Sequence, residues 1–417
     1  MNAPTVPPVR SFSAEFAARP QSVPRLLTVI CLALALGYLV ILASALFTGT
    51  WLIDAEGRPI AGDFVNVYAA GGLTADGHPA LAYDWVIHKS MEIRAVGHGF
   101  DNYYGWHYPP HFLFIAAMLS LLPFVAASLL WLGVTAVPYL AATRGIIGDR
   151  SGYIIALAFP AALWNLSAGQ NGFLTAGLIG FTLLLLERRP VLAGICLGLL
   201  SYKPHFGLLF PVALIAAGHW RALGSATATV AALVVMSLAL FGLETWVAFF
   251  ASMPKMTDAV MGQGLAGFGR LQSVFGFLRT LGWNEKLAWS AQIVVALACT
   301  TTIFVLWHSR VSYELKAAAL ATLALLATPY LYIYDLTVLA IAVAFLLRYA
   351  LPRGMIAAEA AGLAAVAALL LIYPYAKMQV GLAAALVVAA LVAWRATTDH
   401  LSAISAGQTA NQNKPIR

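Results

Sequence analysis

The sequence predicts an all-α protein that crosses a membrane many times, and composition is the first reason. Of the 417 residues, 61% are hydrophobic and only 10% are charged. A soluble protein carries about 25% charged residues, so most of this surface must face lipid rather than water. The net charge of +7 does not indicate nucleic-acid binding, because the basic residues are scattered singly between apolar runs. They are better explained as a signal for membrane topology.

Long apolar runs are the second reason. A membrane-spanning helix needs about 20 apolar residues, and twelve runs approach that length, although some are shorter. We expect spans near residues 26–47, 124–143, 151–168, 172–187, 191–201, 204–218, 222–243, 289–308, 315–328, 331–350, 356–372 and 379–395. Residues 110–122 form a further apolar segment that is too short to cross, and we expect a half-helix in the outer leaflet there.

The positions of the basic residues predict how these helices are oriented. If the N-terminus is inside, Arg144, Arg188, Arg348 and most other basic residues fall in inner loops or tails, as the positive-inside rule requires. Two long loops, residues 48–109 and 244–288, then lie outside. We therefore expect a protein of the cytoplasmic (inner) membrane with both termini in the cytoplasm. Its three predicted regions are a disordered tail at 1–25, a single transmembrane domain at 26–400 and a polar tail at 401–417.

No motif for a metal, a cofactor or a nucleotide stands out. Cys31, Cys196 and Cys299 all lie inside apolar runs, without metal-ligand spacing or a disulfide framework. The chain has neither a phosphate-binding loop of the Walker type nor a dinucleotide fingerprint. We therefore expect no metal, no cofactor and no soluble nucleotide donor.

Function is indicated by polar residues within or beside the apolar runs, because an ionisable group in a membrane is costly to insert. The first such residue is Asp63, which follows the first apolar run and lies close to Asn66 and Tyr68. An aspartate that only caps a helix is the structural alternative.

The aromatic segment 103–111 contains the second group, His107, Tyr108 and His111. Aromatic residues commonly anchor helices at a membrane interface. Two histidines are not needed for that purpose, so a role in a site is the competing interpretation.

Lys203 and Asp335 are charges that interrupt apolar runs. Lys203 precedes a proline and lies close to His205. It could extend its ammonium group to the membrane surface as a structural feature, or it could present a cation to a phosphate. Asp335 needs a partner from another helix, with Lys203, Arg270 or a histidine available, and a purely structural ion pair is the alternative reading.

The second long loop contains a glycine-rich stretch and two arginines, Arg270 and Arg279. Glycines permit close approach of the backbone. An arginine can hold a phosphate through forked hydrogen bonds, and Arg270 is the better candidate because it lies within the glycine-rich stretch.

In order and spacing, these motifs resemble glycosyltransferase family 87, over roughly residues 26–350. The resemblance rests on Gly62-Asp63-Phe64, Tyr68-Ala69-Ala70-Gly71, Leu81-Ala82-Tyr83-Asp84, Tyr108-Pro109-Pro110, Gly169-Gln170-Asn171, Lys203-Pro204-His205, the stretch from Arg270 to Ser273, and Tyr334-Asp335-Leu336. Where the family often has Lys-Pro-Gln, this chain has His205 in the last place.

The resemblance implies a GT-C-like bundle of about 12 transmembrane helices, with short interfacial helices in a long first outer loop. It implies an inverting transferase that moves a hexose, typically mannose, from a polyprenyl-phosphate donor to a lipid or glycan acceptor at the outer membrane face. Asp63 would be the general base, and Lys203, His205 and Arg270 would bind the donor phosphate. Residues expected to bind substrate or support the site are Asn66, Tyr68, Asp84, His107, Tyr108, His111, Gln170, Asn171, Tyr334 and Asp335.

The alternative function is a secondary transporter or flippase for a lipid-linked or small polar substrate. Transporters often contain inverted repeats and broken helices with a site near the midplane. The break at Lys203-Pro204 would suit that function. However, no second half of the sequence echoes the first, and the polar clusters gather on one side.

Overall fold

The computed structural model describes residues 23–376 and 378–412, and this part of the chain is helical apart from turns and loops. Its β-structure is limited to isolated bridges that join Ile53 to Trp51 and to Pro59. The all-α fold class is confirmed. Of the predicted N-terminal tail, residues 1–22 lie outside the described residues. Helix α19 (Val380–Gln412) continues into the predicted C-terminal tail, whose last residues also lie outside them.

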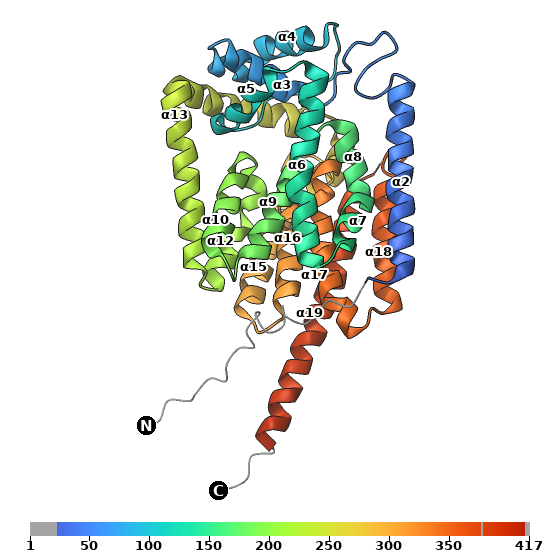
Figure 1. Ribbon diagram of the computed structural model, residues 1–417. Helices are drawn as coiled ribbons and strands as arrows, with labels where there is room; N and C mark the ends of the chain where they lie inside the picture. Colours follow the sequence, from blue (N-terminus) through green and yellow to red (C-terminus); the bar gives the residue numbers. More distant parts are fainter. Residues whose placement is uncertain (1–22, 377, 413–417) are drawn as a thin grey trace.

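Among the described residues, six helices are long and apolar enough to cross a membrane. They are α2 (Arg25–Phe47), α6 (Phe124–Ile147), α13 (Trp220–Thr257) with η4 (Asp258–Gly262), α15 (Glu285–His308), η6 (Ile333–Thr337) with α17 (Val338–Arg353), and the first part of α19. A seventh results if the bent pair α7 (Ser151–Ala158) and α8 (Pro160–Ala168) is one broken span. The protein is therefore a multi-pass membrane protein (Figure 1), whereas the count of about twelve spans stays a prediction.

Shorter apolar helices complete the bundle. They are η2 (Pro110–Phe112) with α5 (Leu113–Ser120), α9 (Gly172–Leu185), α10 (Pro190–Leu199) with η3 (Leu200–Tyr202), α11 (Pro204–Gly207) with α12 (Leu209–Ala216), and α18 (Ala357–Leu371). At 1.5 Å per residue, a segment such as Pro204–Ala216 rises only about 20 Å, against a hydrocarbon thickness of about 30 Å. The segment that connects α10 to α12 accordingly lies well below the top of α6 (Figure 1).

A layer of short helices covers one end of the bundle (Figure 1). It contains α3 (Phe64–Ala75), η1 (Pro79–Tyr83), α4 (Trp85–Val96) and α5. Helices α3 and α5 are in such close contact that a Cβ added at Gly71 would lie 2.0 Å from the backbone oxygen of Ala116. Only glycine permits this approach of two backbones.

Helix α13 changes direction at Gly242, where φ is 76° and ψ is 165°. This conformation is readily adopted only by glycine. The first half of α13 stands at the edge of the bundle, and the second half, residues 243–257, turns across it under the outer layer (Figure 1). It leads into η4 (Asp258–Gly262), η5 (Phe268–Arg270) and α14 (Val274–Thr280). The segment 244–288, predicted as an outer loop, is therefore largely helical.

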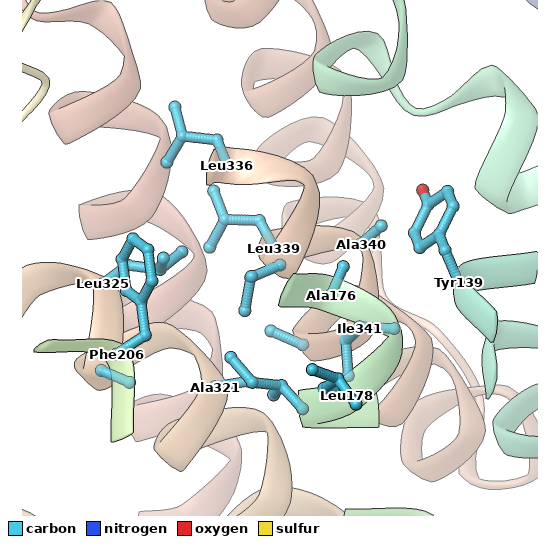
Figure 2. Close-up of a cluster of buried hydrophobic side chains, with 14 of the residues drawn as sticks. Tyr139, Ala176, Leu178, Phe206, Ala321, Leu325, Leu336, Leu339, Ala340 and Ile341 are labelled. Atoms are coloured by element: carbon cyan, nitrogen blue, oxygen red, sulfur yellow. The ribbon is translucent and has the colours of Figure 1, made fainter. Parts of the chain in front are cut away.

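The span formed by η6 and α17 is the centre of the bundle. Of the residues in its most apolar 18-residue stretch, 89% are buried inside the protein, against 17% for the corresponding stretch of α2 and 17% for that of α15. It packs against α16 (Tyr313–Ala327) and α9, and Figure 2 shows the buried side chains that meet there, among them Leu336, Leu339, Ile341, Ala321, Leu325, Ala176 and Leu178. A residue at the start of this span is consequently held by the most enclosed part of the molecule.

The close contact of α3 with α5 generates a stability prediction. Gly71→Ala places a methyl group against the backbone of Ala116, so we expect a loss of about 1–3 kcal/mol of stability from overpacking. The matched control is Gly133→Ala in α6, where an added Cβ meets nothing within 4 Å. Thermal unfolding of the purified variants in detergent measures the difference. Equal melting temperatures for both variants would contradict the close contact.

Candidate active site

A cavity of about 900 Å³ lies between the outer layer and the turns that follow α8, α10 and α18. Its walls come from the start of α3, the segment 103–109, the turns that follow α8 and α10, the second half of α13, η5, η6 and the turn after α18. Ten of the predicted site residues line it: Asp63, Asn66, His107, Tyr108, Gln170, Lys203, His205, Arg270, Tyr334 and Asp335. Stretches far apart in the sequence therefore converge on one site.

An ion pair between Lys203 and Asp335 forms part of the cavity wall. Lys203 Nζ lies 2.6 Å from Asp335 Oδ1, and the two residues are only 7% and 1% exposed. The second carboxylate oxygen of Asp335 accepts a hydrogen bond of 3.1 Å from the backbone N–H of Tyr332. The expectation that Asp335 finds a partner on another helix is confirmed, and that partner is Lys203.

Asp63 occupies the residue before α3, yet its side chain makes no capping hydrogen bond. The helix-capping alternative is therefore wrong. The carboxylate faces the cavity, and its Oδ2 accepts a hydrogen bond of 3.2 Å from Gln170 Nε2. Burial raises the pKa of Asp63 to about 6, although the Gln170 hydrogen bond and the positive charges of Arg270 and Lys203 act in the opposite direction.

The side-chain amide of Gln170 is oriented by its own hydrogen bonds. Its Oε1 accepts from the backbone N–H of Asn171 at 3.1 Å and from the Tyr108 hydroxyl at 3.5 Å. The Tyr108 hydroxyl in turn accepts from Asn171 Nδ2 at 2.7 Å. Because the oxygen of the amide is occupied, its NH₂ group is the end that faces Asp63. This network therefore holds Gln170 in the orientation in which it donates to Asp63, and that hydrogen bond favours the charged form of the Asp63 carboxylate.

Arg270 and His205 also line the cavity, whereas Arg279 does not. Arg270 is exposed and ends the short helix η5. Arg279 donates to the backbone oxygens of Trp283 at 2.9 Å and Gly262 at 3.0 Å, so its guanidinium joins two parts of the loop. Of the two arginines that sequence reasoning considered, Arg270 is the one that faces the cavity.

Asn66 and His107 present neutral polar groups to the cavity. Asn66 Nδ2 donates to the backbone oxygen of Gly105 at 3.5 Å, and its Oδ1 has no hydrogen-bond partner among the described residues. Burial, reinforced by the nearby His88, lowers the pKa of His107 to about 4. His107 is therefore neutral near pH 7 and can donate or accept a hydrogen bond without adding charge.

Tyr68 and Asp84 are not among the residues that line the cavity. The hydroxyl of Tyr68 donates to the backbone oxygen of Leu122 at 2.8 Å. Asp84 caps α4, since its Oδ1 accepts from the backbone N–H groups of Val86 and Ile87 at 3.0 and 3.1 Å. Both side chains have structural partners in or beside the outer layer.

His111 and Asn171 also lie outside the cavity lining. His111 is buried, and its Nε2 lies 3.3 Å from the hydroxyl of Ser201. Asn171 is buried and donates to the Tyr108 hydroxyl through its Nδ2. These two residues support the cavity wall from behind rather than facing its interior.

Sequence reasoning missed the apolar and aromatic parts of the wall, formed by Trp164, Phe249, Met253, Met256 and Tyr373. Trp164 lies within a predicted span, where one large apolar side chain cannot be told from another, and Phe249, Met253 and Met256 lie in the segment 244–288 that was predicted as an outer loop. Tyr373 offered a local signal, because it begins a Tyr-Pro-Tyr sequence at the end of an apolar run. Among the described residues, no group of three His, Cys, Asp or Glu side chains is arranged to hold a metal ion.

The buried ion pair generates a prediction about stability. Lys203→Met leaves Asp335 buried without its cation, and we expect a loss of about 3–5 kcal/mol. The double variant Lys203→Met/Asp335→Leu removes both charges and should recover most of that loss. Melting temperatures in detergent compare the variants. A double variant no more stable than the single one would show that the pairing is not what stabilises this region.

Comparison with known proteins identifies the family. The family model of glycosyltransferase family 87 matches residues 106–329. This range contains His107, Tyr108, Gln170, Lys203 and the glycine-rich loop, whereas Asp63 and Asp335 lie outside it. No curated protein and no solved structure matches the chain. Because the matched range is more than half of the 417 residues, the chain belongs to glycosyltransferase family 87 and is a membrane glycosyltransferase.

Proposed function

We propose that the protein transfers a hexose, most simply mannose, from a polyprenyl-phosphate donor to a hydroxyl group of an acceptor. One observation carries this proposal: a carboxylate without a directly bonded cation, Asp63, shares a single cavity with Lys203, His205 and Arg270. A transferase that uses a sugar phosphate needs a base for the acceptor and cationic groups for the leaving phosphate. The cavity contains Asp63 as the candidate base and Lys203 and Arg270 as cations, and His205 can contribute a neutral N–H donor.

Asp63 is the proposed general base. As the acceptor oxygen bonds to the anomeric carbon, the bond from that carbon to the phosphate oxygen breaks, and the hydroxyl proton passes to the Asp63 carboxylate. Polyprenyl phosphate leaves with the bonding electrons. A single in-line displacement inverts the anomeric centre, so a β-linked donor gives an α-linked product. A pKa of about 6 leaves most of the carboxylate ionised at neutral pH but still basic enough to accept the proton.

Lys203, His205 and Arg270 are the proposed binding groups for the donor phosphate. Lys203 is held by Asp335 through one contact, and an ammonium group has three N–H donors. Two donors are therefore available to phosphate oxygens. Arg270 is exposed to the cavity and can bind two oxygens at once. Stabilising the phosphate lowers the barrier because its negative charge increases as the sugar leaves.

The apolar wall of the second half of α13 supports a lipid-linked donor. Phe249, Met253 and Met256 line the cavity from this segment. Met253 is 45% exposed, and Phe250 on the same segment is 59% exposed, so the segment also offers apolar side chains to its surroundings. Methionine side chains adapt readily to irregular apolar ligands. A polyprenyl chain could therefore lie against this segment while its phosphate reaches Lys203.

The distribution of arginines supports an outward-facing site. Arg144, Arg188 and Arg353 lie at or just beyond the C-terminal ends of α6, α9 and α17, and Arg348 lies in the second half of α17. These helix ends point away from the outer layer (Figure 1). Positive residues favour the cytoplasmic side. We therefore propose that the cavity opens on the extracytoplasmic side of the cytoplasmic membrane and that both termini are cytoplasmic.

Removal of the proposed base tests the mechanism. We expect Asp63→Asn to reduce transfer by about 10²–10⁴-fold, because the acceptor proton has no recipient. The matched control is Asp84→Asn, the same chemical change at a helix cap that asparagine serves equally well. Release of polyprenyl phosphate from a synthetic polyprenyl-phosphate mannose measures the rate. If Asp63→Asn retained the wild-type rate, Asp63 would have no place in the mechanism.

The pH dependence supplies an independent test. The base must be deprotonated, so kcat/KM should fall about tenfold per pH unit below pH 6 and level off above it. Gln170→Leu removes a hydrogen bond that lowers the pKa of Asp63. The break in the pH profile should therefore move to higher pH in that variant. A break that stays in place would mean that another group controls it.

A further inference from the structure

The cavity has two kinds of wall, which come from different helices. One wall contains Phe249, Met253 and Met256 of α13, and the other contains Trp164 and Ser167 of α8 with Tyr373 and Pro374 after α18. In Figure 1 the second half of α13 runs inwards from the left edge beneath the outer layer, whereas α8 and α18 lie towards the right. The two walls can therefore contact two different ligands.

Asp63 belongs to the α8 side. A Cβ added at the preceding residue, Gly62, would lie 3.4 Å from the backbone oxygen of Ala168 at the end of α8. Gln170, in the turn after α8, donates to Asp63. Lys203 lies in the turn after α10 and η3 and is paired with Asp335 at the start of the central span. In an in-line displacement the acceptor and the leaving phosphate lie on opposite sides of the sugar carbon, so the acceptor must enter beside the base.

The α8 wall has the chemistry of a carbohydrate-binding surface. The rings of Trp164 and Tyr373 meet edge to face, with centroids 5.7 Å apart and planes at 61°. The indole N–H of Trp164 is already used, because it donates to the backbone oxygen of Leu370 at 2.7 Å. Trp164 therefore offers ring surface rather than a hydrogen-bond donor. The electron-rich face of an aromatic ring attracts the C–H groups of a pyranose.

The charge and polarity of this wall restrict the class of ligand that it can bind. The described residues of this wall that line the cavity are Trp164, Ser167, Ala168, Tyr373, Pro374 and Ala376, and none of them carries a charge. The Ser167 hydroxyl donates to the backbone oxygen of Leu163 at 2.9 Å, which leaves its oxygen able to accept a hydrogen bond. The side chains of this wall suit a neutral ligand with hydroxyl groups, and the charges of Asp63 and Arg270 lie close enough to act on Tyr373.

We propose that Trp164 and Tyr373 form the acceptor subsite and that the acceptor presents a neutral sugar ring whose hydroxyl faces Asp63. This inference rests on the proposed function and narrows its acceptor to a glycoside. A hydroxyl on a flexible chain, such as a serine side chain, would gain little from two aromatic rings in fixed positions.

The test compares two acceptor types with one donor. Purified full-length protein is supplied with farnesyl-phosphate mannose and with octyl α-mannoside, octyl β-glucoside or N-octanoyl-serine amide. The glycosides should be used in preference to the serine compound, which has the same apolar chain and a free hydroxyl. Equal use of the serine compound, or cleavage of the donor to free mannose with no glycoside product, would overturn the acceptor assignment.

Variants separate ring stacking from a structural role. Trp164→Ala and Tyr373→Ala should each raise the KM for the glycoside by about tenfold, the effect expected for loss of a ring contact, with the KM for the donor little changed. Trp164→Phe keeps a ring but loses the N–H, so its KM should stay close to wild type. Trp220→Ala, at a residue 62% exposed and outside the cavity lining, is the matched control.

The opposite results overturn the inference. If Trp164→Phe is as defective as Trp164→Ala, the bond to Leu370 is what matters and the ring is not a stacking surface. A change in the donor KM alone would assign the wall to the donor. If the wild-type protein neither cleaves farnesyl-phosphate mannose nor transfers its sugar, the proposed function itself fails, and the acceptor assignment fails with it.

Discussion

The ion pair between Lys203 and Asp335 is the constraint on which the site depends. Either charge alone would be expensive to bury in a low-dielectric interior, so the turn after α10 must meet the start of the central span. The two residues are 7% and 1% exposed, so that meeting point lies inside the bundle rather than at its surface. The outer layer and the second half of α13 then enclose the space above it as the cavity.

The same pairing separates the roles of the two carboxylates. Asp335 contacts the ammonium group directly and accepts a backbone hydrogen bond, so it serves as a structural counter-ion. Asp63 has a neutral donor, Gln170, as its hydrogen-bond partner and feels Arg270 and Lys203 only through their charges. Burial therefore prevails over these charges and raises the pKa of Asp63 to about 6, which suits the base that we propose it to be. Gln170 moderates that effect because Tyr108 and Asn171 hold its amide in one orientation.

Charged and glycine residues were the informative part of the sequence. Asp63, Lys203 and Asp335 could be selected because a charge inside or beside an apolar run has to be explained by function or pairing. Trp164 could not be selected, because lipid-facing, core and cavity-facing side chains have the same composition in a membrane helix. Met253 could not, because its segment was predicted as an outer loop. Asp84 shows the opposite error. It was predicted as a site residue because it lies in a motif that resembles the family's, but its carboxylate caps α4.

The sequence by itself determined the all-α membrane class, the family and the charged residues of the candidate site. Hydropathy and the free-energy cost of burying a charge are properties of each residue and can be judged without knowing its contacts. The tertiary structure decided which of the polar residues meet, which aspartate is paired and which walls the cavity has. These depend on contacts between helices more than a hundred residues apart and on the direction in which each side chain leaves its helix. The bend of α13 at Gly242 shows the difference, because the glycine can be seen in the sequence but the wall it creates cannot.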